Sequence, residues 1–368
     1  MILLLHNRYR TTGGEERAVD DLLWLLRERL GEDAELLARD SADLGRGRAA
    51  AGMLVGGLDP EEVTAAVRRT GARVVHAHNV NPAFGWRALE AARGAGARVV
   101  LHLHNYRLVC AVGTCFTRGA DCTRCHGRNT VPGVALRCRG QLGEAAVYGA
   151  GLALHQARLA GASDAFVVPS AFALGRLRDL GAPLGDRARV VASVQREFAD
   201  RSHAGCGSYA LVAARLSPEK GVDLAIRACA SAGLPLVVAG DGPQAPELRA
   251  LAAGSDVRFA GRVSPEELRE LRRGAAVALV PSRYQEIFPL AAAESMAAGL
   301  PTVAAAAGGL VDFVPASELV PPDDEAALGG AVRARFGDEE AGERALAAAR
   351  ERTSPEVVGA ALRAVYDG

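Results

Sequence analysis

The most constraining feature of this sequence is a repeated alternation of short apolar runs with amphipathic stretches. In the first half, apolar runs of strand length occupy residues 2–6, 73–78, 98–104 and 165–170. Amphipathic stretches follow them, one beginning near Glu15, one at 84–96 and one ending at Gly181. Strands that alternate with helices predict a parallel sheet with helices on both faces, so we expect an α/β fold.

The alternation lapses at the polar segment RSHAGCGS, residues 201–208, and then starts again. Five further apolar runs follow, in the order YALVAARL, PLVVAG, VRFAG, VALVPS and PTVAAAAGG. A chain of 368 residues fits two domains of roughly 150 to 200 residues each. We therefore predict two Rossmann-like domains, at 1–200 and 201–354, and a C-terminal helix at 355–368 that packs back on the first.

Composition narrows the class of partner. Lys plus Arg and Asp plus Glu number 43 each, so no net field favours nucleic acid, which we do not expect as a partner. MILLLHNRYR has no basic region before its apolar run and no small-residue cleavage site after it, and no run approaches the ~20 apolar residues of a spanning helix. We expect a cytoplasmic protein, with at most peripheral contact at the inner face of the membrane. The sequence gives no indication of oligomeric state.

Polar motifs follow the predicted strands, where ligands bind in open α/β sheets. Gly13 and Gly14 lie between a strand and a helix, where glycines let backbone amides approach an anion, although an ordinary tight turn also accounts for them. In ARLSPEKG, Ser217 is the predicted N-cap, which places Lys220 in the first helical turn. Lys220 and Arg215 then suit a diphosphate, although basic residues there are often simply solvated.

The segment QEIFPLAAAES places Glu286 and Glu294 eight positions apart around an apolar spacer. Pro289 suits the first turn of a helix that stops at Gly299, so Glu286 lies in the loop before it and Glu294 inside it. A poorly solvated carboxylate needs partners, and ribose or sugar hydroxyls would suffice, but the spacing alone carries little weight. The run GDGP, which starts at Gly240, lacks the full G-x-G-x-x-G pattern and is explained by a turn packed near a ligand.

The segment VPSRYQEIFPLAAAESMAAGLPTVAAAAGGL resembles the signature of the family 4 glycosyltransferases (glycosyl transferases group 1), which have the two-domain GT-B fold. The resemblance extends over most of the chain. It covers, in order, HNRYRTTGGEERAVDDLLWLL, VVHAHN, VVLHLHNYRLVC, VVPSAFALGRLRDLG, ARLSPEKGVDLAIRA, VVAGDGP and FAGRVSPEEL. It implies a retaining, hexosyltransferase-type enzyme that moves a sugar from a nucleotide-sugar donor, UDP- or GDP-linked, to a hydroxyl of a glycan, lipid-linked or natural-product acceptor.

The same resemblance implies roles for individual residues. Arg215 and Lys220 match the positions that neutralise the donor diphosphate and stabilise the leaving nucleotide. Glu286 matches a contact to hydroxyls of the transferred sugar, Glu294 a contact to the ribose, and His104 a histidine near the reactive centre. Further donor-binding positions are Gly13, Gly14, Gly240, Val263, Ile287, Phe288, Pro289 and Leu290, and acceptor-side positions are His78, Asn105 and Arg107. Front-face displacement in such enzymes requires no metal or other cofactor for catalysis.

Two departures from the family pattern motivate an alternative. Ile287 stands where relatives commonly have glycine, and VVASVQREF at 190–198 lacks a familiar asparagine at the domain linker. A nucleotide-sugar-binding protein without transferase activity is therefore the alternative function. An epimerase or phosphorylase on the same fold is a weaker one, since a phosphorylase needs a cofactor lysine or phosphate site that the sequence does not clearly offer.

A cysteine-rich insertion occupies residues 107–140. Its C-x2-C pair is part of a candidate structural zinc site at Cys110, Cys122, Cys125 and Cys138, with Cys115 and His126 as spare ligands. A subset of the resembled enzymes carries a similar spacing after H-N-Y-R-L, and free thiols or a disulfide are the alternatives. The segment is also basic, with six arginines against Asp121, so we expect it to lie on the acceptor side and to favour anionic or polar acceptors or a membrane surface.

Overall fold

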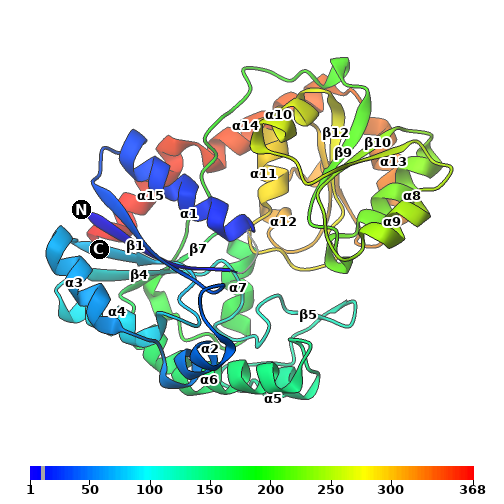
Figure 1. Cartoon of the computed structure of the whole chain (residues 1–368). Helices are drawn as coiled ribbons and strands as arrows, with labels where there is room; N and C mark the ends of the chain where they lie inside the picture. The colour runs from blue at the N-terminus through cyan, green and yellow to red at the C-terminus, as the bar shows by residue number, and fades with distance from the viewer. Residues whose placement is uncertain (10–12) are drawn as a thin grey trace. The chain divides into compact units, whose positions relative to one another are not determined.

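The computed structural model describes residues 1–9 and 13–368 and divides the chain into two compact units (Figure 1). The first unit comprises Met1–Cys115, Cys122–Val194 and Pro355–Gly368, and the second comprises Phe116–Asp121 and Gln195–Ser354. The two threonines of the TTGG motif lie outside the described residues.

The first unit is built on a sheet of six parallel strands in the order β2-β1-β3-β4-β7-β8. The strands are β1 Ile2–Arg8, β2 Ala34–Asp40, β3 Val74–Ala77, β4 Arg98–His102, β7 Ala165–Val168 and β8 Ala188–Val190. The four predicted strands correspond to β1, β3, β4 and β7. The prediction missed β2, a half-exposed edge strand, and β8, which has only three residues.

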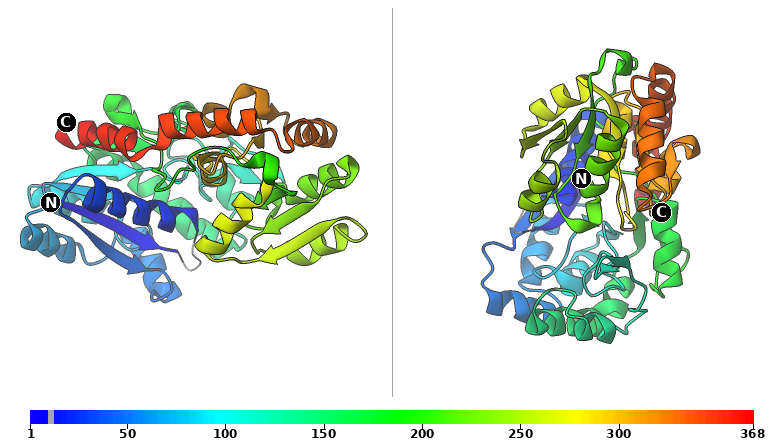
Figure 2. Two further views of the ribbon diagram at one scale, coloured as in Figure 1. Left: turned by 90° about the horizontal axis from the view of Figure 1, so that it is seen from above. Right: turned by 90° about the vertical axis from the view of Figure 1, so that its right-hand side faces the viewer.

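Helices cover both faces of this sheet. They are α1 Gly14–Trp24, η1 Leu25–Arg29, α2 Arg46–Val55, α3 Pro60–Thr70, α4 Gly85–Gly94, α5 Val131–Ala135, α6 Leu142–Gly161, α7 Ala171–Asp179, η2 Gly185–Arg187 and α15 Pro355–Asp367. One buried cluster joins Leu4 of β1 to Val19 of α1 and Leu362 of α15. Both chain ends therefore lie in this unit, as Figure 2 shows.

The second unit contains a second sheet of six parallel strands, in the order β11-β10-β9-β12-β13-β14. Its strands are β9 Tyr209–Ala213, β10 Leu236–Ala239, β11 Val257–Gly261, β12 Ala275–Val280, β13 Thr302–Ala305 and β14 Leu319–Val320. The five predicted runs correspond to β9 to β13, and the two-residue β14 was not predicted. A separate antiparallel hairpin is formed by β5 Phe116–Thr117 and β6 Ala120–Asp121. The predicted fold class, two Rossmann-like parallel sheets, is confirmed.

Most helices of the second unit alternate with its strands. The helices are η3 Ala204–Cys206, η4 Pro218–Lys220, α8 Val222–Ala232, α9 Ala245–Leu251, α10 Pro265–Arg273, α11 Leu290–Ala297, α12 Leu310–Phe313, η5 Ala316–Glu318, α13 Glu325–Arg335 and α14 Glu339–Thr353. Among them, η3 precedes β9 and α14 follows α13 directly. In the described part of the chain, none of the helices combines the length and the apolar character that crossing a bilayer requires.

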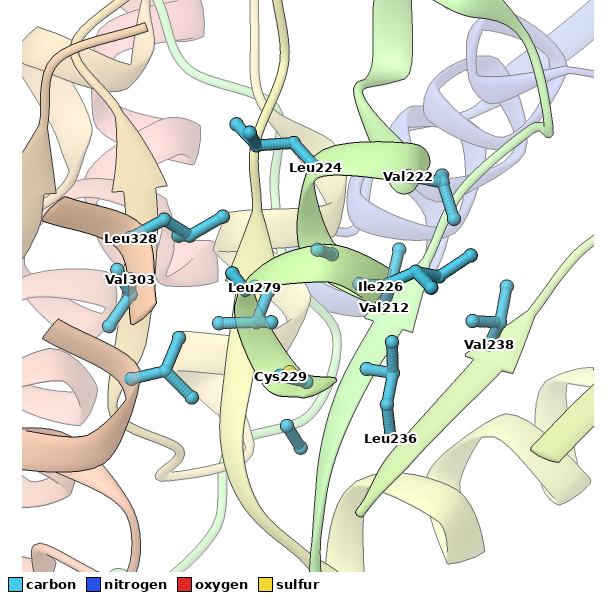
Figure 3. Close-up of a cluster of buried hydrophobic side chains, with 14 of the residues drawn as sticks. Val212, Val222, Leu224, Ile226, Cys229, Leu236, Val238, Leu279, Val303 and Leu328 are labelled. Atoms are coloured by element: carbon cyan, nitrogen blue, oxygen red, sulfur yellow. The ribbon is translucent and has the colours of Figure 1, made fainter. Parts of the chain in front are cut away.

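The core of the second unit lies where α8 and α13 pack on the sheet (Figure 3). Val212 of β9 and Leu279 of β12 meet Ile226 of α8, and Leu328 of α13 completes the same cluster. Each is at most 2% exposed, and burying such a side chain contributes about 1.5–3 kcal/mol. This packing fixes the carboxyl ends of β9 and β12, from which the candidate site residues extend.

The strand orders identify one switch point in each sheet. In the first unit the chain places β2 on one side of β1 and β3 on the other; in the second it places β10 on one side of β9 and β12 on the other. Open α/β sheets bind ligands in the crevice at the carboxyl ends of the strands at such a point. A ligand site is therefore expected at the loops after β1 and β3 in the first unit and at the loops after β9 and β12 in the second.

Candidate active site

In the loop after β9, Ser217 is the N-cap and Pro218 the first residue of a helix, as predicted. The helix is the short 3-10 helix η4 and not an α-helix, and Gly221 with φ +65° separates it from α8. The Ser217 hydroxyl donates to Oε1 of Glu219 at 2.6 Å and makes no capping hydrogen bond. The reason for the break at Gly221 is close packing, since a Cβ on Gly221 would lie 2.0 Å from the carbonyl oxygen of Pro281. The loop after β9 therefore runs directly against the loop after β12.

Lys220 and Glu286 meet across these two loops. Nζ of Lys220 donates to Oε1 of Glu286 at 3.0 Å and to the Tyr284 hydroxyl at 3.3 Å. The Ser282 hydroxyl donates to the same Glu286 oxygen. Burial alone disfavours a charged amine, but the Glu286 carboxylate raises the pKa of Lys220 above its ordinary value, while burial raises the pKa of Tyr284 to about 12. A charged ammonium is thus held in place at the switch point.

Lys220 is also unusual in its residue type, a signal that is independent of the sequence motifs. It is the only lysine among the 43 Lys and Arg residues of the chain. All the other residues in that count are arginine, so the one lysine, a compact and strongly hydrated cation, lies in this loop. This count was available from the sequence and would have singled out Lys220 without any motif.

Arg215 presents the opposite environment. It follows β9 and is exposed, and its guanidinium has no hydrogen-bond or ion-pair partner among the residues that the structure describes. Lys220 is compensated by a carboxylate, whereas Arg215 carries a charge with no local counterpart. A site with one fixed cation and one free cation suits a dianionic ligand such as a diphosphate.

Two glycines after β13 hold the loop that carries Glu286. The amide of Gly308 donates to Oε1 of Gln285 at 2.6 Å, and the amide of Gly309 donates to the carbonyl of Glu286 at 2.6 Å. Gly308 has φ +60°, and a Cβ there would lie 2.2 Å from the Glu286 nitrogen. Ile287, unusual for the family pattern, is 5% exposed, so its side chain packs inside the unit and does not project from the loop.

Glu294 lies inside α11 as predicted but has an unexpected partner. Its carboxylate accepts from the guanidinium of Arg272 at the end of α10, and the two side chains are 10% and 6% exposed. Ligand hydroxyls were expected to satisfy this carboxylate, and in this structure an arginine does so instead, because the helix that follows β11 brings Arg272 beside α11. Removing one partner of such a buried pair is strongly destabilising.

The other predicted donor-binding residues have identifiable packing roles. Gly240 has φ +136°, and a Cβ there would lie 1.9 Å from the carbonyl oxygen of Ala214, so the GDGP turn packs against the segment after β9. Val263 packs against the core beneath β11. Phe288 stacks edge-to-face on Phe313 with ring centroids 5.5 Å apart. Pro289 is the N-cap of α11 and Leu290 its first residue.

In the first unit, Gly13 is the N-cap and Gly14 the first residue of α1, but the Gly13 amide already donates a hydrogen bond within the chain. The Gly13 amide donates to Oε2 of Glu16 at 2.8 Å, and the Tyr9 amide donates to Oε1 of Glu16 at 3.0 Å. Gly13 has extended backbone with φ −137°, so no left-handed turn requires glycine there. In this structure the Glu16 carboxylate therefore accepts from the Gly13 amide, and donor binding by Gly13 and Gly14 stays a prediction.

Asn105 and Arg107 belong to a network that the sequence reading only partly identified. Nη1 of Arg107 donates to the Tyr9 hydroxyl at 2.9 Å, and that hydroxyl donates to Oε2 of Glu15 at 2.7 Å. The Arg107 amide donates to Oδ1 of Asn105 at 2.9 Å. Burial raises the pKa of both Tyr9 and Glu15. Tyr9 and Glu15 carried no motif of their own, and only the folded loop shows that they neighbour Arg107.

His78 and His104, both predicted, lie next to each other at the ends of β3 and β4. Nδ1 of His78 and Nε2 of His104 are 2.8 Å apart. Burial and the neighbouring His6 lower the pKa of His104 to about 3, so its imidazole is neutral at neutral pH. His76 and His102 stack on this pair. The alternation in VVHAHN and VVLHLH, which puts both histidines of each segment on one face, was the signal that identifies them.

The cysteine-rich segment carries the four cysteines of the predicted zinc site. Its cysteines form no disulfide in the described part of the chain, and a hydrogen bond with Cys115 lowers the pKa of Cys110 to about 6. Cys122 continues the β5–β6 hairpin, with its amide donating to the carbonyl of Cys115 at 2.8 Å. Within the described ranges, the one group of three or more residues close enough to share an ion is His76, His78 and His102. Zinc at Cys110, Cys122, Cys125 and Cys138 stays a prediction.

Known proteins resemble the chain both in sequence and in fold. Residues 194–352 match the family model "Glycosyl transferases group 1". The D-inositol 3-phosphate glycosyltransferase of Acidothermus cellulolyticus is 40% identical over 148 residues, which cover 34% of this chain and 33% of that protein. A GDP-mannose-dependent alpha-(1-6)-phosphatidylinositol dimannoside mannosyltransferase of Mycobacterium tuberculosis is 33% identical over 174 residues, 44% of this chain and 45% of that protein. The matched part of the chain thus spans less than half the length of these relatives.

A solved structure matches the whole chain. The Anabaena protein Alr3699/HepE in complex with UDP and glucose aligns with a TM-score of 0.67 at 17% identity, over 100% of this chain and 99% of that one. At this identity the likeness establishes the fold alone. Residues 194–352 are therefore similar to the glycosyl transferases group 1 family, and the chain has the GT-B fold.

Proposed function

We propose that the protein is a retaining glycosyltransferase that moves a sugar from a UDP- or GDP-linked donor to a hydroxyl of a glycan, lipid-linked or natural-product acceptor. One observation carries the proposal. Arg215 and the Lys220–Glu286 pair lie at the carboxyl ends of β9 and β12, at the switch point of a domain similar to the glycosyl transferases group 1 family. The UDP and glucose in the HepE complex and the GDP-mannose dependence of the mycobacterial relative support the two donor classes.

The cations supply the electrostatic part of the mechanism. As the bond between the anomeric carbon and the phosphate oxygen breaks, negative charge develops on the leaving nucleoside diphosphate. Lys220 is already charged and oriented by Glu286 and Tyr284, so it stabilises that charge with little reorganisation. Arg215 is exposed and can form two parallel hydrogen bonds to phosphate oxygens.

Glu286 has a second role in this scheme. Lys220 and Ser282 both donate to Oε1, and Oε2 has no partner among the described residues. Oε2 can therefore accept from a hydroxyl of the transferred sugar while Oε1 keeps Lys220 in place. Glu294 is paired with Arg272, so neither glutamate is arranged as the free acid or base of a hydrolase pair. Retention then follows from front-face attack, in which the leaving phosphate accepts the proton of the acceptor hydroxyl.

The acceptor side of the proposal rests on the first unit. His104 is neutral and hydrogen-bonded to His78, so it can orient a hydroxyl without adding charge. Arg107 is compensated by Glu15 through Tyr9, and with Asn105 it offers polar groups beside the N-terminus of α1. These residues are proposed to position the acceptor hydroxyl.

A donor screen followed by a turnover assay tests the function. Purified full-length chain is first screened against UDP-, GDP- and dTDP-sugars by thermal shift, because a bound donor raises the melting temperature by mass action. Release of free nucleoside diphosphate is then measured with an acceptor panel, and the anomeric configuration of the product is read by NMR. Binding without turnover on any pair would favour a nucleotide-sugar-binding protein, and an inverted product would refute the retaining mechanism.

A further inference from the structure

Three buried histidines of the first unit form a group that the proposed function does not use as a unit. His76 lies in β3, His78 directly follows that strand, and His102 ends β4; we call them the histidine cluster. They are 0%, 3% and 8% exposed. A ring nitrogen from each lies within 4.8 Å of the others. Strand pairing sets this arrangement, since His76 is opposite Val100 and the next alternate positions are His78 and His102.

The hydrogen bonds of the cluster leave specific nitrogens unsatisfied. Nδ1 of His76 is 2.7 Å from the Tyr366 hydroxyl, and Nδ1 of His78 is 2.8 Å from Nε2 of His104. Nε2 of His76, Nε2 of His78 and both ring nitrogens of His102 are buried with no partner in the described part of the chain. Buried polar atoms are nearly always bonded, so this concentration of unsatisfied nitrogens points to a missing ligand.

The protonation state suits a cation. Burial lowers the pKa of His76 to about 3 and the pKa values of His78 and His102 well below the ordinary range. Each imidazole is therefore neutral at neutral pH and has one N–H and one lone pair. If Nδ1 of His76 and of His78 carries the proton and donates it to its neighbour, the lone pair of each Nε2 faces the unsatisfied space.

We propose that His76, His78 and His102 bind a divalent transition metal ion of the zinc class. Three neutral imidazoles are a ligand set that Zn²⁺ accepts and that Mg²⁺ and Ca²⁺ disfavour. Tyr366 and His104 are the outer partners that fix the ring tautomers, as second hydrogen bonds do for metal-bound histidines. His76 and His78 now stack with their planes 15° apart, so coordination requires the rings to turn.

The ion would have two consequences inside the first unit. It would hold His78 in the tautomer that donates to His104, and so fix the orientation of a residue proposed to act at the acceptor. It would also strengthen the attachment of α15, because Tyr366 on that helix contacts His76. Neither consequence involves the cysteine-rich segment.

Zinc stoichiometry tests the proposal once the C-x2-C pair, Cys122 and Cys125, is removed as a competing pair of ligands. In full-length Cys122→Ser/Cys125→Ser chain, stripped with chelator and reloaded with Zn²⁺, elemental analysis is expected to find one ion per chain. Adding His102→Leu is expected to abolish binding, whereas His203→Leu, which removes an exposed histidine of the second unit, should not change it. If His102→Leu does not fold, His102→Gln replaces it. Absence of zinc in the parent, or full retention in the His102 variant, would overturn the proposal.

Cobalt substitution provides a second readout. Co²⁺ bound by imidazoles gives visible ligand-field bands without the near-ultraviolet charge-transfer band of a thiolate ligand, and we expect that spectrum. A thiolate band would assign the ion to the remaining cysteines and refute the histidine site. Tyr366→Phe should weaken zinc affinity about 10–100-fold, as loss of an outer-shell partner does. These measurements use no donor or acceptor, so their failure is distinct from failure of the transferase proposal.

Discussion

At the carboxyl ends of β9 and β12 the second unit gathers charged side chains, whereas at the ends of β3 and β4 the first unit gathers neutral imidazoles. Both places are at or beside the switch point of a parallel sheet. In the second unit, Lys220 keeps its charge because Glu286 accompanies it into the protein. In the first, burial and the neighbouring His6 outweigh the Glu16 carboxylate, and His104 loses its proton instead. Similar sheets thus carry a buried ion pair in one unit and neutral imidazoles in the other.

The largest expected effect concerns the buried Arg272–Glu294 pair of the second unit. Glu294→Ala leaves Arg272 buried without its carboxylate, which we expect to destabilise the second unit by about 3–5 kcal/mol. Urea unfolding measures the change, with the exposed Glu340→Ala as control. The double variant Arg272→Met/Glu294→Leu should recover most of the stability. A single variant as stable as wild type would show that the pair is not a structural element of this site.

A slightly smaller effect is expected on catalysis at the fixed cation. Lys220→Ala should lower kcat about 10²–10³-fold, as removal of one transition-state donor does, while affecting donor affinity less. Lys220→Arg keeps the charge but not the compact geometry and should recover only part of the rate. Steady-state kinetics decide, with Arg352→Ala as a surface control. Unchanged kinetics in Lys220→Ala would show that Lys220 does not stabilise the leaving group.

A backbone change tests whether the loop of Glu286 must be held. Gly308→Ala adds a Cβ that would lie 2.2 Å from the Glu286 nitrogen at a residue with φ +60°. We expect a cost of roughly 1–3 kcal/mol and a displaced Glu286. Gly330→Ala, at a helical position whose added Cβ meets nothing within 4 Å, is the matched control. Equal melting temperatures and equal activities for the two variants would contradict this role of Gly308.

The smallest expected effect is a pH dependence of the unfolding free energy that arises from Asp223 in the second unit. Burial opposes ionisation of Asp223, but hydrogen bonds from Arg283 hold its pKa at about 2, below the ordinary 3.8. A carboxylate with a lowered folded-state pKa adds stability above its unfolded value, and this stability is lost as pH falls from about 4 to about 2. Unfolding free energies of wild type and Asp223→Asn should therefore converge over that interval. Parallel curves would contradict the assignment.

Much of this architecture was predictable because it depends on local pattern. Strands such as β12, with six buried residues in a row, appear as uninterrupted apolar runs, and the motifs that follow them appear at fixed spacing. The edge strand β2 and the short strands β8 and β14 were missed, because half-exposed or two- to three-residue strands give too little pattern. The N-cap position of Ser217 was predicted correctly, but the break after Lys220 was not, since the close approach of Gly221 to Pro281 depends on a residue 60 positions away in the chain.

The sequence by itself determined the two parallel sheets, the strand ends that carry the site, and the identity of its cations and carboxylates. Only the tertiary structure decided which of these side chains contact each other. Lys220 finds Glu286 across 66 positions, Glu294 finds Arg272 across 22, and two strands bring four histidines together. The physical reason is that pattern and propensity act between near neighbours, whereas the charge state of a buried group depends on whichever side chain the fold places beside it.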